Sequence, residues 1–112
     1  VDANLSTGDN KEQFPIGEVL HNTHLSYVAA TVATSGTTNV TSIQIHNITE
    51  AVDMLSTNLT IDSAETKSST AATPAVINSA NSLVSKNDII RIDIDAISTT
   101  APKGLRIILG FS

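Results

Sequence analysis

The acidic residues that could support chemistry lie close together in the last third of the chain. Asp93 and Asp95 are two positions apart, and Asp88 begins the same segment, residues 88–98. Carboxylates at this spacing in a strand point to one side, where they could bind Ca²⁺ or act as the acid and base of a glycosidase. We favour a solvated strand face on which Arg91 pairs with an aspartate, because no other carboxylate cluster or aromatic sugar platform accompanies them. The sequence leaves cation binding by Asp93 and Asp95 open.

Three histidines, His21, His24 and His46, raise the question of a zinc site. His21 and His24 are three positions apart, but the chain contains no cysteine. No second histidine pair or glutamate motif completes a ligand set. We therefore expect surface or strand-edge histidines, and we predict no metal site and no bound cofactor.

The chain lacks the motifs that position a catalytic nucleophile. It has no Gly-x-Ser-x-Gly elbow, no cysteine and no glycine-rich phosphate loop. We therefore predict that the protein is not an enzyme and has no catalytic residues.

Asn-x-Ser/Thr triplets begin at Asn4, Asn39, Asn47 and Asn58. In a secreted eukaryotic protein they would be glycan acceptors. The chain is rich in Asn, Ser and Thr and shows neither a leader sequence nor cysteines. We therefore interpret the triplets as chance.

The element that must position the aspartates is a strand. In residues 88–98, isoleucines recur at every second position with charged residues between them. This alternation is typical of a half-buried β-strand, which needs neighbouring strands and a second apolar layer. Turn residues and β-rich composition predict further strands over the following segments: 14–20, 25–34, 39–48, 52–55, 57–62, 70–77 and 105–111.

These seven or eight strands, without helical periodicity, predict an all-β fold: an antiparallel β-sandwich of jelly-roll type. Pro15 indicates an edge strand. Residues 78–87 have room for one helical turn, and residues 99–104 give a hairpin signal. Ile97 and Ile108 are expected at outer positions that a neighbour could cover.

The length of 112 residues predicts one domain. Residues 1–13 are polar, and we expect a flexible N-terminal arm that frays or orders against a neighbouring subunit. Residues 14–112 form the single β-sandwich domain. The N-terminal residues lack a basic start followed by an apolar stretch, so we expect no signal peptide.

Charge and hydropathy exclude two classes of partner. The net charge is −5, and the six basic residues do not cluster, so we expect no nucleic-acid binding. No apolar run approaches the roughly 18 to 20 residues that span a membrane. The absence of cysteine fits synthesis in a reducing cytoplasm.

Four stretches resemble sequence blocks of virion proteins from tailed bacteriophages. They are residues 43–62 (IQIHNITEAVDMLSTNLTID), 65–77 (ETKSSTAATPAVI), 88–95 (DIIRIDID) and 103–111 (KGLRIILGF). The resemblance extends over residues 25–111, and residues 1–24 match nothing. It implies a homotrimeric β-sandwich with a structural task, either capsid decoration (cement) or a module of a fibre or tail protein.

Our leading hypothesis is a cement protein that binds the major capsid protein on the outer capsid surface and is made in the host cytoplasm. The acidic balance favours the outside of a shell over its DNA-facing lining. The alternative is a receptor- or carbohydrate-binding module of a tail or fibre protein. Its binding edge would be loops 34–39 and 62–69, but Tyr27 is the chain's only tyrosine and there is no tryptophan.

Overall fold

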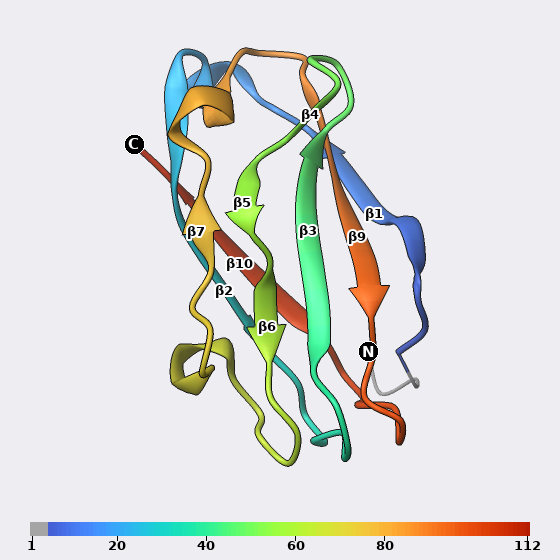
Figure 1. Cartoon of the computed structure of the whole chain (residues 1–112). Helices are drawn as coiled ribbons and strands as arrows, with labels where there is room; N and C mark the ends of the chain where they lie inside the picture. Colours follow the sequence, from blue (N-terminus) through green and yellow to red (C-terminus); the bar gives the residue numbers. More distant parts are fainter. Residues whose placement is uncertain (1–4) are drawn as a thin grey trace.

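Two antiparallel sheets packed face to face, together with a small two-stranded sheet, make up the fold in the computed structural model, which describes residues 5–112 (Figure 1). The larger sheet holds, in spatial order, β1 (Gly8–Pro15), β9 (Ile89–Ala96), β3 (Thr41–Asn47) and β4 (Val52–Asp53), with β6 (Leu59–Ile61) also paired to β3. The smaller sheet holds β10 (Arg106–Phe111), β2 (Thr23–Thr31) and β8 (Leu83–Val84). A two-stranded sheet holds β5 (Leu55–Thr57) and β7 (Val76–Ile77). The predicted β-sandwich is confirmed.

Short elements account for the difference from the predicted strand count. Within residues 5–112 there are ten strands, several of only two or three residues, because segments 52–62 and 70–84 break into short pieces. The helical elements of this part are single 3₁₀ turns: η1 (Glu18–Leu20), η2 (Ser68–Thr70) and η3 (Ser79–Asn81). The helical turn expected in residues 78–87 is confirmed by η3. None of the helices described is long and apolar enough to cross a membrane.

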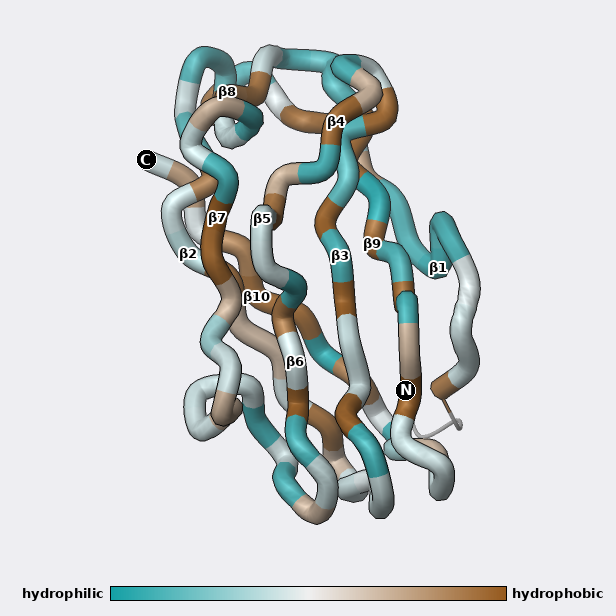
Figure 2. Tube along the Cα trace, viewed as in Figure 1, coloured by the Kyte–Doolittle hydropathy of each residue, from teal (hydrophilic) through white to brown (hydrophobic). Residues whose placement is uncertain are grey.

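The core is built from isoleucines on alternate positions of β3 and β9. Ile43, Ile45, Ile90 and Ile94 are at most 1% exposed, and side chains of β2 cover them from the smaller sheet, among them Leu25. Figure 2 shows the resulting alternation of apolar and polar residues along β3 and β9. The inward face predicted for the isoleucines is confirmed.

A side chain replaces a piece of the backbone ladder in the middle of β3. β3 pairs with β6 at one end and β4 at the other, and Leu55 lies between them. The Gln44 amide accepts from the Leu55 N–H and donates to the Leu55 carbonyl, both at 3.0 Å. It also donates to Asn58 Oδ1 at 2.8 Å. Because Gln44 satisfies both backbone groups of Leu55, β5 can turn away from β3 and pair with β7.

The N-terminal segment differs from the expected arm. Residues 8–13, expected within the flexible arm 1–13, lie in β1 and pair with β9; residues 1–4 lie outside the described residues. β1 shows no apolar alternation, since nearly all its side chains are exposed. Backbone pairing holds it, together with a 2.8 Å bond from the Asn10 N–H to Asp93 Oδ1. Pro15 does lie on an edge strand, as predicted.

The hairpin expected at residues 99–104 is wrong, because β9 and β10 belong to different sheets. The loop instead crosses between the layers and pairs with residues 34–37 through Thr34–Lys103 and Thr37–Thr100 bridges. Ile97 is also not an outer residue: it is partly buried and packs against the core. Ile108 is 55% exposed, as expected for an outer position.

Where the loop crosses between the layers, Ser98 and Thr100 lie very close to the backbone of Gly36. A Cβ added there would lie 2.6 Å from the Ser98 Cβ and 2.7 Å from the Thr100 carbonyl oxygen. We expect Gly36→Ala to lower the free energy of unfolding by about 1–3 kcal/mol through overpacking, measured by urea denaturation. Gly17→Ala is the control, since no heavy atom lies within 4 Å of its added Cβ. Equal effects of the two substitutions would contradict this packing.

Candidate functional site

The sandwich is closed along one side and open along the other. On the closed side, residues 66–68 lie against β2, where the Ala30 N–H donates to Ser68 Oγ and the Val32 N–H to the Thr66 carbonyl. On the open side, β1 ends the larger sheet and β10 ends the smaller one (Figure 1). Between these two strands lies a cleft of about 750 Å³.

The lining of this cleft is almost entirely apolar. Its residues come from β1, β9, β10 and the neighbouring loops: Leu5, Lys11, Glu12, Phe14, Leu20, Ile92, Ile94, Leu105, Ile107, Leu109 and Phe111. Protein cores rarely leave voids larger than a water molecule. A cleft of this size is therefore not a packing defect of the core, and it has room for part of another molecule. Among the described residues that line it, only Lys11 and Glu12 are charged. Such a surface is suited to binding apolar groups.

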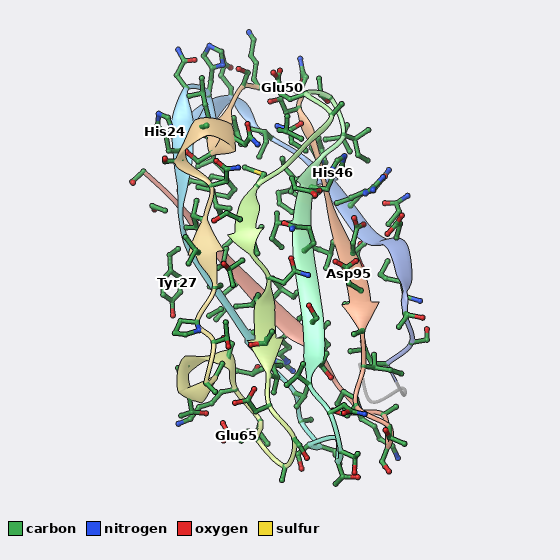
Figure 3. All side chains as sticks on the ribbon, viewed as in Figure 1. His24, Tyr27, His46, Glu50, Glu65 and Asp95 are labelled. Carbon is green, nitrogen blue, oxygen red and sulfur yellow. The ribbon has the colours of Figure 1, made fainter. Side chains whose placement is uncertain are left out.

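A second apolar surface lies on the outside of the smaller sheet and on the neighbouring strand β7. Tyr27, Ile108 and Val76, here called the outer apolar patch, are 56%, 55% and 50% exposed. The Tyr27 side chain packs close to Gly110, whose added Cβ would lie 3.1 Å from the Tyr27 Cβ, and Ile108 lies diagonally opposite on the same face. Tyr27 and Val76 border a hollow of about 460 Å³. Figure 3 shows Tyr27 at the edge of the molecule near β7.

The two aspartates that the sequence suggested as a pair differ in burial and in hydrogen-bond partners. Asp93 is only 4% exposed; it accepts from Arg91 Nε at 2.9 Å and from the Asn10 N–H at 2.8 Å. Asp95 is exposed and accepts from Asn58 Nδ2 at 2.9 Å. The predicted pairing of Arg91 with an aspartate is confirmed, although β1 covers Asp93 and that part of the face is not solvated. With Asp93 engaged in structural bonds, the geometry offers no pair of free carboxylates.

Asp88, the third acidic residue of this segment, serves the fold. It is 4% exposed, and its Oδ2 accepts from Asn47 Nδ2 at 3.1 Å and from the Ser85 N–H at 3.0 Å. These bonds fix the turn that leads into β9. Asp88 therefore lies away from the solvent and does not extend a carboxylate cluster.

The three histidines bond to different partners. The Nδ1 atoms of His21, His24 and His46 contact the Lys86 N–H, Ser82 Oγ and Asp53 Oδ1 respectively. Figure 3 shows His24 and His46 on separate strands. Within residues 5–112, no group of three or more His, Cys, Asp or Glu side chains is placed to hold a metal ion.

Two of the Asn-x-Thr asparagines have structural tasks. Asn47 is fully buried and bonded to Asp88, and Asn58 bonds to Gln44, Ser42 and Asp95. A glycan on either side chain would break these bonds. Asn39 is exposed, and Asn4 lies outside the described residues.

The loops predicted as a carbohydrate-binding edge do come together. The Thr38 N–H donates to Ser63 Oγ and the Ala64 N–H to the Gly36 carbonyl, both at 2.8 Å. Loops 34–39 and 62–69 therefore share one end of the sandwich. Neither contains an aromatic residue, so this end lacks the flat apolar faces on which sugars usually stack.

Comparison of the chain with protein-family models, curated proteins and solved structures gives no significant match. The similarity of its segments to tailed-phage virion proteins therefore stays a prediction. The two apolar surfaces are the features of the described residues that indicate binding.

The contrast between the two aspartates is testable. Asp93→Asn removes the charge that neutralises the partly buried Arg91, so we expect a loss of about 1–3 kcal/mol in the free energy of unfolding. Asp95→Asn keeps a hydrogen-bonding side chain at an exposed position and should change it by less than about 0.5 kcal/mol. Urea denaturation measures both. A Ca²⁺-dependent rise in Tm that both variants abolish would instead show that the pair binds a cation.

Proposed function

We propose that this protein is a non-enzymatic virion structural protein, a capsid decoration (cement) protein that binds the outer surface of a tailed-phage capsid and stabilises the shell. The observation that carries the proposal is the outer apolar patch. Soluble monomers seldom expose large apolar side chains together, and such clusters are typical of surfaces that bind other proteins. The resemblance of residues 25–111 to virion proteins supplies the kind of partner, the major capsid protein.

The chemistry of the patch suits a docking surface. Tyr27 is a rigid aromatic residue that gives a large contact area at small entropic cost, and tyrosine is common among residues that dominate interface energies. Ile108 and Val76 flank Tyr27, and Arg106 lies two positions before Ile108 on the same face of β10. Burying these side chains against a shell contributes roughly 25 cal/mol for each Å² of apolar area removed from water.

A protein of this kind stabilises a capsid by mass action. Because it binds the assembled shell and not the separated subunits, its binding free energy adds to the stability of the assembly. The net charge of −5 favours the outer surface, where no nucleic acid has to be neutralised. Homotrimeric assembly, which the resemblance implies, places several docking patches on one particle-bound unit and increases the effective affinity.

The direct test mixes the purified protein with shells that lack it. We expect saturable binding, measured by sedimentation, and restored resistance to heat or osmotic shock. The temperature at which the shells are disrupted measures the resistance to heat. Absence of binding to such shells would end the proposal. Saturable binding to a glycan array without shell binding would favour the carbohydrate-binding alternative instead.

A matched pair of variants tests the patch itself. Ile108→Asp places a charge in the outer apolar patch and should weaken shell binding at least about tenfold, since a desolvated unpaired charge costs more than 1.4 kcal/mol. Leu83→Asp is the control. Leu83 is similarly exposed at 47%, but it lies on β8 and pairs with His24, near the end of β2 that is remote from Ile108. Equal loss in both variants would show that the patch is not the docking surface. Circular dichroism checks that both variants remain folded.

A further inference from the structure

The smaller sheet stops short of the larger one on the open side of the sandwich. Within residues 5–112, β2 is the only strand that pairs with β10, so the other edge of β10 is free. Figure 1 shows β10 crossing behind the larger sheet, with β1 at the border of that sheet. The inner faces of β1 and β9 contribute Phe14, Ile92 and Ile94 to the cleft beside this edge. The cleft therefore lies where one more strand of the smaller sheet would lie.

The two strand edges beside the cleft differ in their capacity to pair. β1 carries features that protect an edge strand: Pro15, a register shift, and the charged residues Asp9, Lys11 and Glu12. β10 has no proline and one charged residue, and its register with β2 is regular from Arg106 to Gly110. Of the two edges, β10 is the one that can accept a further strand.

The backbone groups on the free edge of β10 can be assigned. The Ala30 N–H donates to Ser68 Oγ, on the side of β2 away from β10, and Ala30 is paired with Ile107. In an antiparallel ladder, a residue whose N–H points away from its neighbour belongs to a pair without mutual hydrogen bonds. The N–H and C=O groups of Ile107, and of Leu109 two positions on, therefore point to the free edge and have no partner in β2.

The side chains of β10 define what an added strand would have to present. Ile107 and Leu109 line the cleft, whereas Arg106 and Ile108 alternate with them and lie on the outer face. A strand beside β10 follows the same alternation, so every second side chain enters the cleft. Its other side chains lie beside Arg106, which makes no ion pair within the described part of the chain. An acidic side chain at an outer position would complement that charge.

We propose that the free edge of β10 and the cleft together form a site for β-strand addition. The occupant is an extended segment of another protein, about as long as the six residues of β10, with apolar side chains at alternate positions and an acidic residue between them. Main-chain hydrogen bonds to Ile107 and Leu109 hold such a segment, and the cleft selects its side chains. The site is distinct from the outer apolar patch, because Ile107 and Ile108 point to opposite faces of β10.

The backbone edge and the width of the larger sheet select this occupant over two others. A small apolar molecule would fill the cleft but could not pair with the N–H and C=O groups of Ile107 and Leu109. A second folded copy would bring its own wider sheet, so the β1 strands of the two copies would meet before their β10 edges could pair. A single extended segment carries no second sheet.

A synthetic peptide tests the site. The probe is acetyl-Glu-Val-Thr-Val-Thr-Val-Glu-amide with a fluorescent label, and we expect saturable binding in fluorescence anisotropy. A peptide of the same composition with its valines in one run is the control. It should bind about tenfold more weakly, because one valine must then face away from the cleft. No binding of the alternating peptide, or equal binding of the two, would overturn the proposal.

Hydrogen exchange measured by NMR shows whether the peptide pairs with the backbone. We expect slower exchange of the Ile107 and Leu109 amides in the complex. Dodecanoate is the comparison probe, because it can fill an apolar cleft without forming a ladder. Peptide binding that leaves the exchange of both amides unchanged would overturn strand addition and show that the cleft takes apolar groups only.

Removing hydrogen-bond donors tests the same contact from both sides. N-methylation of the valines and N-methylation of the threonines block opposite edges of the peptide, so one version should lose binding at least about tenfold and the other should retain it. In the protein, Leu109→Pro removes an N–H that the β2 ladder does not use, and it should weaken binding similarly. Leu109→Val keeps the N–H and is the control. Equal binding of the two N-methylated peptides would refute the pairing, even if Leu109→Pro fails to fold.

Other outcomes separate this site from a contact between copies and from the proposed function. A dimer of the free protein that Leu109→Pro dissociates and the peptide does not would assign the β10 edge to a second copy and overturn the proposal. Leu109→Pro is expected to lose the peptide and still bind capsid shells through the outer apolar patch. Peptide binding by a protein that binds no shells would refute the proposed function and leave strand addition supported.

Discussion

The structure depends on covering one face of β3 and β9. Their isoleucines are removed from water only because a second sheet lies over them, and that sheet is narrower than the one it covers. The cover is therefore complete beneath β3, but incomplete toward β1. The cleft between β1 and β10 follows from this difference in width.

Much of the fold could be predicted from local pattern. The alternation in residues 88–98 predicts β9 and its inward face, and the β-rich composition predicts a sandwich. What the sequence did not show are elements held by long-range bonds. β1 has no apolar alternation and is held by its pairing with β9, and the Gln44 amide holds β5 in a way no periodicity reveals. The prediction of a hairpin at residues 99–104 was wrong, because Pro102 and Gly104 indicate a turn but do not specify which sheet the next strand joins.

The candidate site was harder to predict for a related reason. Residues such as Asp93 and the histidines invite chemical interpretations, yet several of their partners lie far away in sequence, among them Asn10 for Asp93 and Ser82 for His24. The surfaces that do suggest function are made by ordinary apolar residues, and no residue type distinguishes Ile107 in the cleft from Ile108 in the outer patch. The one available signal was the apolar character of both faces of the last strand, which indicated that another chain could cover it.

The pairing of β1 with β9 also has a consequence for synthesis. It joins residues such as Phe14 and Ile90, so β1 cannot take its place in the sheet until β9 has also been synthesised. Contacts between such distant segments slow folding.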